Sequence, residues 1–378
     1  MNDGSASATE FDPRDLTVAI EPAGAPGDIA TLWRDLEQRA DSPFFLSWHW
    51  IGPWLALSGA TPLRLTVRHG RLAVGLALLQ PARLQRHYVI RPHALLLHQT
   101  GNVAQDCITI EYNGLLADRR FADAVSRAAL AHLERDARWD ELHLAGVTAA
   151  AVPATRHGAV TPWLRARAPS WRVDLDALRR EGHPYLATLG ANTRYQIRHA
   201  MRLYERRGPL SLTPARTVAE ALQFFDGLKE LHQRSWRARH KPGSFAHPFF
   251  ERFHRALIAG GIPDGYVELV RVAAGEEAIG YVYNFVHRGH VYNYQTGFAY
   301  ERDAKLKPGL VSHALCIERH LESGARVYDF LAGDQRFKRN LGTPGPEMVD
   351  LVLQRASPML AAERALRQAK AALLSVLR

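Results

Sequence analysis

Apolar and polar residues follow two periods along the chain, and these periods predict helices and strands in a repeated order. In the first half, helical spacing predicts helices over residues 29–39 and 120–137. Short apolar runs that predict strands lie at residues 63–67, 72–79, 94–97, 107–110 and 141–144. The turn His69-Gly70 predicts a hairpin between the first two of these strands.

The second half repeats this order with clearer signals. Its predicted helices cover residues 184–207, 218–237, 248–259, 309–322 and 357–378. Its predicted strands cover residues 210–213, 266–272, 278–286, 291–297, 327–331 and 348–353. Helices, then an antiparallel meander, then a strand–helix–strand unit indicate an α+β fold. Because the order occurs twice, we expect two tandem domains, each a mostly antiparallel mixed sheet flanked by helices.

A segment rich in Pro, Gly and Arg at residues 152–170 predicts the linker between the domains. We therefore expect a disordered N-terminus over residues 1–15 and a first domain over 16–165. The second domain is expected over 166–356, followed by an amphipathic C-terminal helix over 357–378. This helix could pack on its own domain or, peripherally, on a membrane surface.

Composition narrows the class of protein. The 378 residues are 47% hydrophobic, which allows two ordinary cores. Cys107 and Cys316 are too far apart in sequence to indicate a disulfide framework, and the start of the chain lacks the pattern of a signal peptide. No apolar stretch reaches the ~20 residues that span a bilayer. We expect a cytoplasmic protein.

The net charge of +10 comes mainly from arginine. A basic surface would attract an acidic partner such as a CoA nucleotide, an acyl carrier protein, tRNA or an anionic membrane. The arginine-rich composition of a GC-rich genome explains the charge equally well.

The loop before the predicted helix at 309–322 is a candidate anion site. It reads Lys305-Leu306-Lys307-Pro308-Gly309. The first amides of a helix are unpaired and carry partial positive charge, so they bind anions, and a pyrophosphate is the natural ligand. A surface helix that begins with proline is the alternative.

Asp329 lies inside an apolar predicted strand, where an ionised carboxylate needs a partner. We expect that partner to be Lys338 or an arginine. A structural ion pair and a catalytic carboxylate both explain such a residue.

Several of these residues form one pattern, namely Tyr294, Gly297, Pro308, Gly309, Gly324, Asp329, Phe330, Leu331, Gly333, Asp334 and Lys338. The pattern resembles the CelD/BcsL-like subfamily of GNAT acyltransferases, which is found beside polysaccharide biosynthesis functions. In the first half, the spacing of Phe45, Ser47, Trp50 and Trp54 resembles the start of such proteins. Asn340-Leu341 departs from the family, which carries an aromatic residue there.

The resemblance implies an N-acyltransferase that moves an acyl group from a thioester to an amine of a small molecule or sugar precursor, in polysaccharide or envelope biosynthesis. The donor would be acetyl-CoA or another acyl-CoA, or else an acyl carrier protein thioester. The first domain would shape the acceptor cleft without catalysing the reaction. The histidines lack the spacing of a zinc site, so we expect no metal.

The resemblance also assigns roles to residues of the second half. The catalytic candidates are Tyr294, Asp329, Asp334 and Lys338. The donor-binding candidates lie on a splayed strand at residues 291–297 and in the loop that follows it. They are Gln295, Thr296, Gly297, Lys305, Lys307, Pro308 and Gly309. The substrate-binding candidates are Trp236, Tyr283, Asn284, Arg194 and Arg198.

Two other hypotheses remain open. Arg194, Arg198, Arg202 and Arg206 recur every four residues, so they lie near one helix face. This face is either solvated or docks a phosphate-rich partner, and it resembles the arginine-bearing helix of Fem-type aminoacyl-tRNA-dependent transferases. The third hypothesis is a non-catalytic, GNAT-like subunit of an exopolysaccharide assembly. DNA is not an expected partner, and the oligomeric state is open.

Overall fold

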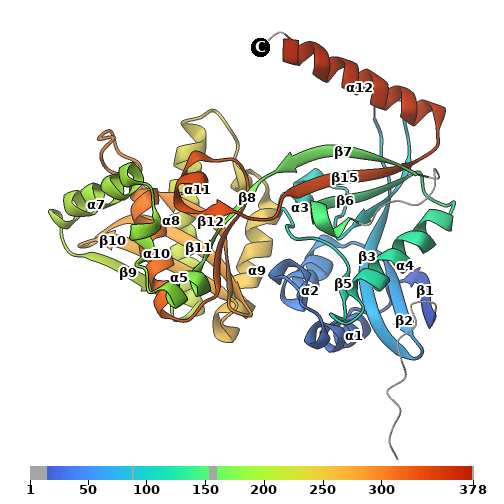
Figure 1. Ribbon diagram of the computed structural model, residues 1–378, viewed down its shortest axis with the longest axis horizontal. Helices are drawn as coiled ribbons and strands as arrows, with labels where there is room; N and C mark the ends of the chain where they lie inside the picture. Colours follow the sequence, from blue (N-terminus) through green and yellow to red (C-terminus); the bar gives the residue numbers. More distant parts are fainter. Residues whose placement is uncertain (1–14, 87–88, 153–159, 377–378) are drawn as a thin grey trace, which may run out of the picture.

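A computed structural model describes residues 15–86, 89–152 and 160–376 of the chain. These residues form two lobes, each built on one sheet (Figure 1). The predicted disordered segment 1–15 lies outside the described residues except for Asp15.

The first lobe contains an eight-stranded sheet. The order is β1-β2-β3-β4-β6-β15-β7, and the short β5 also pairs with β3. Only β4 and β6 run parallel, over three residue pairs. The strands are β1 (Leu16–Pro22), β2 (Leu63–His69), β3 (Leu72–Arg83), β4 (His93–Leu97), β5 (Leu116–Ala117), β6 (Glu141–Thr148), β7 (Val160–Ala168) and β15 (Met348–Arg355).

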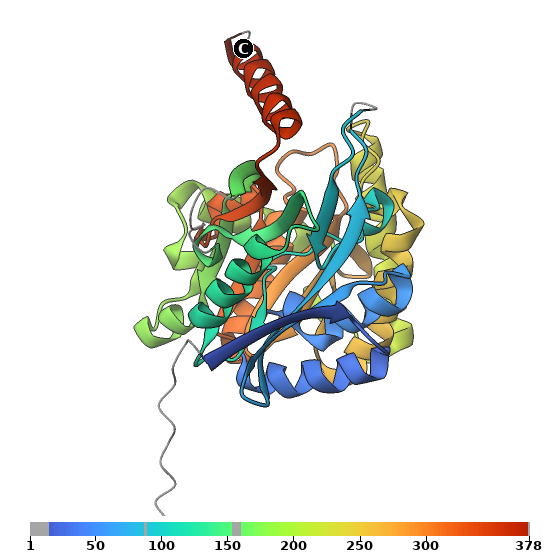
Figure 2. The ribbon, with the colours of Figure 1, turned by 90° about the vertical axis from the view of Figure 1, so that its right-hand side faces the viewer.

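The helices of the first lobe lie on both faces of its sheet (Figure 2). They are α1 (Pro26–Arg39), α2 (Trp48–Ser58), α3 (Val103–Asp106) and α4 (Ala122–Arg135). Apolar positions of α4 such as Val125, Ala129 and Leu133 recur at helical spacing and are buried. They pack in one core with apolar side chains of β2, β3, β4 and β6.

The second lobe contains a seven-stranded sheet in the order β14-β8-β13-β12-β11-β10-β9. Again only one pair, β12 and β13, runs parallel. The strands are β8 (Ser170–Asp174), β9 (Leu210–Pro214), β10 (Val267–Ala274), β11 (Glu277–His287), β12 (His290–Phe298), β13 (Val327–Ala332) and β14 (Thr343–Pro344). The helices are α5 (Leu175–Glu181), α6 (Tyr185–Thr188), α7 (Ala191–Glu205), α8 (Val218–Arg237), α9 (Pro248–Asp264), α10 (Pro308–Glu322) and α11 (Arg336–Leu341).

The expected α+β class is confirmed: both sheets are mixed, mostly antiparallel and flanked by helices. In each lobe a helix, α4 or α10, lies in sequence between the two parallel strands. The chain does not divide at one point, however. Strand β15, which falls within the second predicted domain, inserts between β6 and β7 of the first sheet.

Three predicted elements, and the predicted linker, differ from the structure. Residues 107–110 form no strand, because Thr109 has a positive φ of 43°. The helix predicted over 184–207 is two helices, α6 and α7, interrupted at Leu189 and Gly190. Helix α9 continues past Gly260-Gly261 to Asp264. The predicted linker also contains β7, an edge strand.

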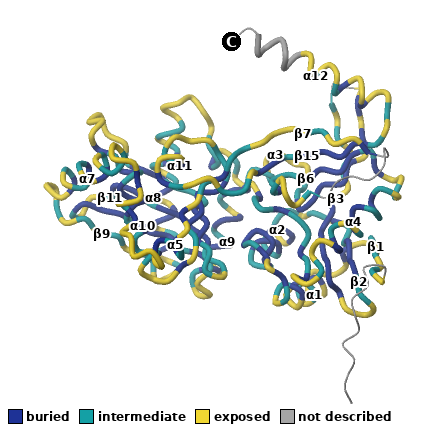
Figure 3. Tube along the Cα trace, viewed as in Figure 1, coloured by how far each residue is buried: buried dark blue, intermediate teal, exposed yellow. Residues whose placement is uncertain are grey.

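The two lobes share an aromatic core, and buried segments of both lobes lie where they meet (Figure 3). Phe44 of the first lobe stacks on Phe285 of the second, with ring centroids 4.3 Å apart. Trp50 meets Phe253 edge to face at 4.9 Å. Because these side chains are almost fully buried, they join the lobes into one packed unit.

Helix α12 (Pro358–Val376) projects away from both lobes (Figures 1 and 2). Its first turns hold it to the first lobe, since Leu360 and Glu363 are buried and Glu363 pairs with Arg86 at 2.9 Å. Within the described part of the chain, no helix has both the length and the apolar character needed to cross a bilayer.

Candidate functional site

Strands β12 and β13 separate soon after they begin. Their pairing covers only three residue pairs and ends at Tyr292 and Asp329. On the other edge of β12, the register with β11 shifts so that Tyr294 is an extra residue between Asn293 and Gln295. Such a bulge bends a strand. Beyond Tyr292, the edge of β12 therefore has no pairing with β13, as predicted for a splayed strand.

The Thr296 amide faces this open edge. The Ala299 amide donates to Ile279 of β11 at 3.0 Å. Since amides alternate between the two edges of an antiparallel strand, the Thr296 N–H points away from β11. It donates to the side-chain oxygen of its neighbour Gln295 at 3.1 Å. The Thr296 N–H thus has one acceptor, the Gln295 side-chain carbonyl, and could donate to a ligand carbonyl in its place.

Helix α10 begins at the end of the loop that follows β12. Lys307 is the N-cap residue and provides no side-chain cap, so the first amides of the helix are available to an anion. Lys305 is exposed and Lys307 is half-buried. Gly309 faces the Phe298 ring, which would lie 3.1 Å from an added Cβ. The two lysines and the helix dipole give this end positive charge.

Asp329 connects the lobes through hydrogen bonds. Its side chain is 1% exposed and accepts from the Tyr112 hydroxyl at 2.6 Å and from His290 Nε2 at 3.1 Å. It also accepts from the Leu331 amide at 2.7 Å. The predicted partner Lys338 acts on Asp329 only through its charge, and no hydrogen bond joins the two side chains. Tyr112, from the first lobe, takes that place.

Lys338 lies nearby but binds backbone. Its ammonium donates to Leu331 and Ala332 carbonyls at 3.3 and 2.6 Å. Burial lowers the pKa of Lys338, an effect opposed by the charges of Glu111 and Asp329. The residue therefore holds the end of β13 and supplies positive charge to two carboxylates.

Glu111 is the second carboxylate of this cluster and comes from the first lobe. It accepts from the Ala332 amide at 2.7 Å. Burial of the carboxyl group raises its pKa to about 7, although the Ala332 bond and Lys338 act in the opposite direction. A carboxylate that titrates near neutrality can accept and release protons.

The backbone around this cluster is strained. Thr109 and Tyr112 have positive φ angles of 43° and 50°, and Leu331 across the junction has 62°. Left-handed backbone is unfavourable for threonine, tyrosine and leucine, and such residues concentrate at functional sites. The strained residues lie in the segment that carries Glu111 and in the segment that follows Asp329.

Comparison with known families identifies the second lobe. Residues 191–339 match the family described as acetyltransferase (GNAT) domain. The second lobe contains a GNAT-type acetyltransferase domain. The splayed strand, the mouth of α10, Asp329 and Lys338 lie within the matched residues, whereas Glu111 and Tyr112 come from the first lobe. The chain is accordingly an acyltransferase. The CelD/BcsL-like subfamily stays a prediction.

Solved structures share the fold of about nine-tenths of this chain at low sequence identity. A conserved protein of unknown function from Bacteroides thetaiotaomicron VPI-5482 is 9% identical with a TM-score of 0.55, covering 90% of this chain and 100% of its own. FemX is 12% identical, with a TM-score of 0.55 and coverage of 89% and 97%. The DUF2156 domain of a lysylphosphatidylglycerol synthetase from Agrobacterium fabrum is 11% identical, with a TM-score of 0.51 and coverage of 93% and 97%. No curated protein matches the chain in sequence.

The hydroxyl group of Tyr294 forms a contact between the two lobes. Its hydroxyl donates to the Ile108 carbonyl of the first lobe. His254 Nε2 lies 3.2 Å from the same hydroxyl, and its Nδ1 lies 3.3 Å from the Tyr283 hydroxyl. Burial raises the pKa of Tyr294 well above its ordinary value, which disfavours the phenolate that a tyrosine base would need.

Four other predicted site residues make contacts with groups outside the Asp329 cluster. Asp334 is exposed and pairs with Arg339 at 3.1 Å. Asn284 is buried and donates to Glu268 at 2.9 Å. Trp236 packs on His232, with ring centroids 5.6 Å apart. Gly297 is needed for packing, because an added Cβ would lie 2.4 Å from the Leu228 carbonyl.

Arg194 and Arg198 lie on α7, at the end of the second lobe away from the first (Figure 1). Arg194 donates to Ala187 and Leu189 carbonyls at 3.2 and 3.3 Å. Arg194, Arg198 and Arg202 line a surface hollow of about 510 Å³. This hollow is separate from the splayed strand.

Sequence reasoning missed Glu111, Tyr112 and His290. Their roles depend on contacts across the chain, such as that between Tyr112 and Asp329, and no local pattern marks them. Among the described residues, no group of three or more His, Cys, Asp and Glu is arranged to hold a metal ion.

Proposed function

We propose that the protein is an acyl-CoA-dependent N-acyltransferase that acylates an amine of a small molecule or sugar precursor. The observation that carries the proposal is the Thr296 amide. It faces the edge of β12 that β13 has left, and its acceptor is a neighbouring side chain. A role in polysaccharide or envelope biosynthesis stays part of the proposal, resting on the resemblance alone.

The residues present fit a CoA thioester. The free amides at the start of α10, with Lys305 and Lys307, would hold its diphosphate. The Thr296 amide would donate to the thioester carbonyl after Gln295 turns aside, and would stabilise negative charge developing on that oxygen. The bound donor supplies a thioester whose C–S bond breaks as the amine forms an amide bond.

Glu111 is the proposed proton acceptor. The amine loses one proton as its N–C bond forms, and the leaving thiolate takes up one proton. Glu111 accepts from Ala332 at the end of β13, the strand that diverges from β12 after Asp329. An acceptor amine held where the strands diverge would be near this carboxylate. The Tyr112–Asp329–His290 contacts hold this junction together.

Reversing the two lysine charges should weaken CoA binding. In Lys305→Glu with Lys307→Glu, we expect acetyl-CoA affinity to fall about 10- to 100-fold, because two charge-assisted contacts to phosphate become repulsive. Acetyl-CoA binding is measured by thermal shift, since a ligand of the folded state raises stability. Lysines are preferred to Gly309, where a bulky residue would also displace Phe298.

A matched control is Arg71→Glu with Arg91→Glu, which makes the same charge change at exposed positions of the first lobe. It should keep the acetyl-CoA shift. Equal losses in both double variants would mean that net charge, and not the mouth of α10, governs binding.

A Fem-like aminoacyl-tRNA-dependent transferase is the second candidate, favoured by the arginine-lined hollow on α7. Its affinity for tRNA would fall steeply with salt through counterion release. Thermal shifts with acetyl-CoA, longer acyl-CoAs, acyl carrier protein and tRNA distinguish these donors. A non-catalytic subunit would respond to none of them.

A further inference from the structure

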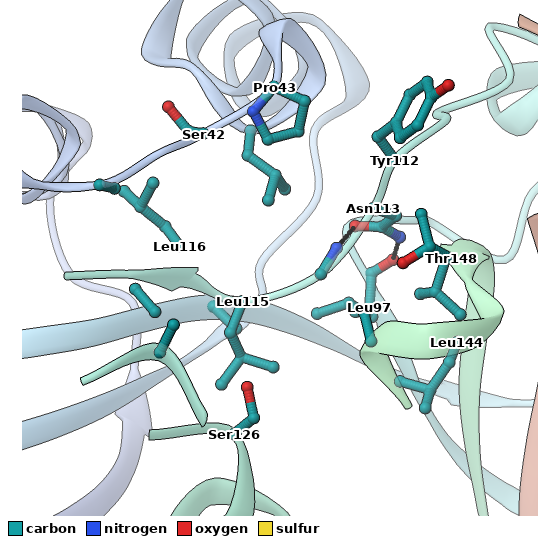
Figure 4. A pocket seen from close by; sticks show the side chains of 18 of the residues that line it. Ser42, Pro43, Leu97, Tyr112, Asn113, Leu115, Leu116, Ser126, Leu144 and Thr148 are labelled. Carbon is teal, nitrogen blue, oxygen red and sulfur yellow. Dashed lines mark hydrogen bonds between the residues drawn. The ribbon is translucent and has the colours of Figure 1, made fainter. Parts of the chain in front are cut away.

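The first lobe contains a cavity of about 1110 Å³ (Figure 4). This volume is above the ~300–1,000 Å³ usual for small-molecule pockets. Most of its wall is aliphatic, with Leu79, Leu97, Leu130, Leu133, Leu142 and Leu353 among the lining residues. The cavity continues to the junction with the second lobe, where Tyr112 and His290 line it.

The cavity follows from the width of the sheet. A helix is about 10 Å across, whereas neighbouring strands lie ~4.8 Å apart, so one helix covers two or three strands. Helix α4 packs mainly on β1, β2, β3 and β5. Leu97 of β4, Leu144 of β6 and Leu353 of β15 therefore line a space beside α4. Figure 4 shows Leu97 and Leu144 in this wall.

The junction end of the cavity is polar. Tyr112 and His290 donate to Asp329 there. His287, Arg288 and Arg326 of the second lobe and Ser42 of the first also line the cavity.

These features describe an amphiphile. An aliphatic space with a polar end matches an alkyl chain that carries a polar head. Glu111 does not line the cavity itself, but its charge acts on Tyr112, which does, so it would lie near that head. A head that Glu111 can deprotonate is an amine.

We propose that this cavity binds the alkyl chain of an amphiphilic amine, and places its amino group at the junction as the acyl acceptor. The inference rests on the proposed function and narrows its substrate class. The amine loses a proton to Glu111 and gains the acyl group. The wall of the cavity selects acceptors by chain length.

The test uses n-octylamine, n-decylamine and n-dodecylamine below their micelle concentrations, with binding to the full chain followed by calorimetry. Each methylene transferred from water contributes about 0.8 kcal/mol, so affinity should rise by up to about fourfold per methylene. Affinity that does not depend on chain length overturns the proposal.

Two substitutions on α4 that narrow the cavity, and one control, test whether the alkyl chain binds there. Ser126 lines the cavity and its side chain points into it (Figure 4). Ser126→Phe should lower n-dodecylamine affinity at least tenfold, whereas Ala128→Phe, on a half-buried neighbour that does not line the cavity, should not. Ala129→Phe, at a buried lining position, is the second narrowing variant. Melting curves of all three variants verify folding, and equal affinity in Ser126→Phe and Ala128→Phe overturns the site.

The acetyl-CoA thermal shift is measured in parallel. Amine binding without an acetyl-CoA shift would reject the proposed function but keep the cavity as a chain site. An acetyl-CoA shift without amine binding would reject the cavity proposal alone. Loss of a dodecanoyl-CoA shift in Ser126→Phe, with amine binding unchanged, would assign the cavity to the donor chain and overturn the acceptor assignment.

Discussion

Glu111→Gln is expected to lower kcat by about 10²- to 10⁴-fold, the usual contribution of a general base. Glutamine keeps the oxygen that accepts from the Ala332 amide but cannot take up a proton. Because the active form is the carboxylate and its pKa is about 7, wild-type activity should rise with pH through about pH 7. The variant should lack this rise.

The control is Glu347→Gln, at an exposed position in front of β15. It should keep both kcat and the pH profile. A Glu111→Gln enzyme with wild-type activity and an unchanged acidic limb would remove Glu111 from the reaction. The rate is measured as release of free thiol from the acyl-CoA that gives the largest thermal shift.

The same substitution has a stability readout with a defined sign. The folded-state pKa of Glu111, about 7, is above its ordinary value of 4.5. Wild-type folding therefore loses stability as pH rises through the interval between these two values, where the folded protein binds more protons than the unfolded chain. Glu111→Gln should be more stable than wild type at pH 8, and this gain should be absent at pH 4. Loss of activity with gained stability is typical of a functional residue.

Much of the donor region could be predicted from the sequence because its signals are local. The meander β10–β12, helix α10 and strand β13 lie within a few residues of their predicted limits. Turn residues mark the two hairpins, and Pro308 opens the helix. The prediction of a splayed strand needed only this order of elements and the family pattern.

The junction could not be predicted in the same way. Tyr112 and Asp329 meet across 217 positions in the chain, and this distance leaves no periodic signal. Gly261 illustrates a different failure. The helix predicted over 248–259 ends just before Gly260-Gly261, yet α9 continues through both glycines. Gly261 is instead needed for packing, since an added Cβ would lie 2.3 Å from Val267. A glycine required for close packing and a glycine that ends a helix look alike in one sequence.

The position of β15 is a third case. Its short apolar run correctly predicts a strand, but a strand pattern does not say which sheet the strand joins. Once β15 pairs with β6 and β7, the last strand of the chain stabilises the lobe that contains the cavity. The chain therefore passes from the first lobe to the second and back again, and the aromatic core joins the two lobes as well.

Trp50→Ala should destabilise the whole protein by about 3–5 kcal/mol, the range for truncating a buried large aromatic side chain. Trp50 is 1% exposed and belongs to the first lobe, but its ring meets Phe253 and Phe285 of the second at 4.9 and 5.8 Å. The cavity left by alanine would therefore weaken packing on both sides of the junction.

The reactivity of Cys316 measures the unfolding of the second lobe in this experiment. It is 1% exposed, within α10, so it reacts with a thiol reagent only when the second lobe opens. In a Cys107→Ser background, Trp50→Ala should lower the urea midpoints of circular dichroism and of Cys316 labelling together, because one core serves both lobes.

The control is Trp163→Ala, on edge strand β7. It removes a half-buried ring that contacts the Arg165 and Arg367 guanidinium groups and should lower the free energy of unfolding by about 1 kcal/mol or less. Cys316 protection that stays at the wild-type level in Trp50→Ala would show that the lobes unfold independently.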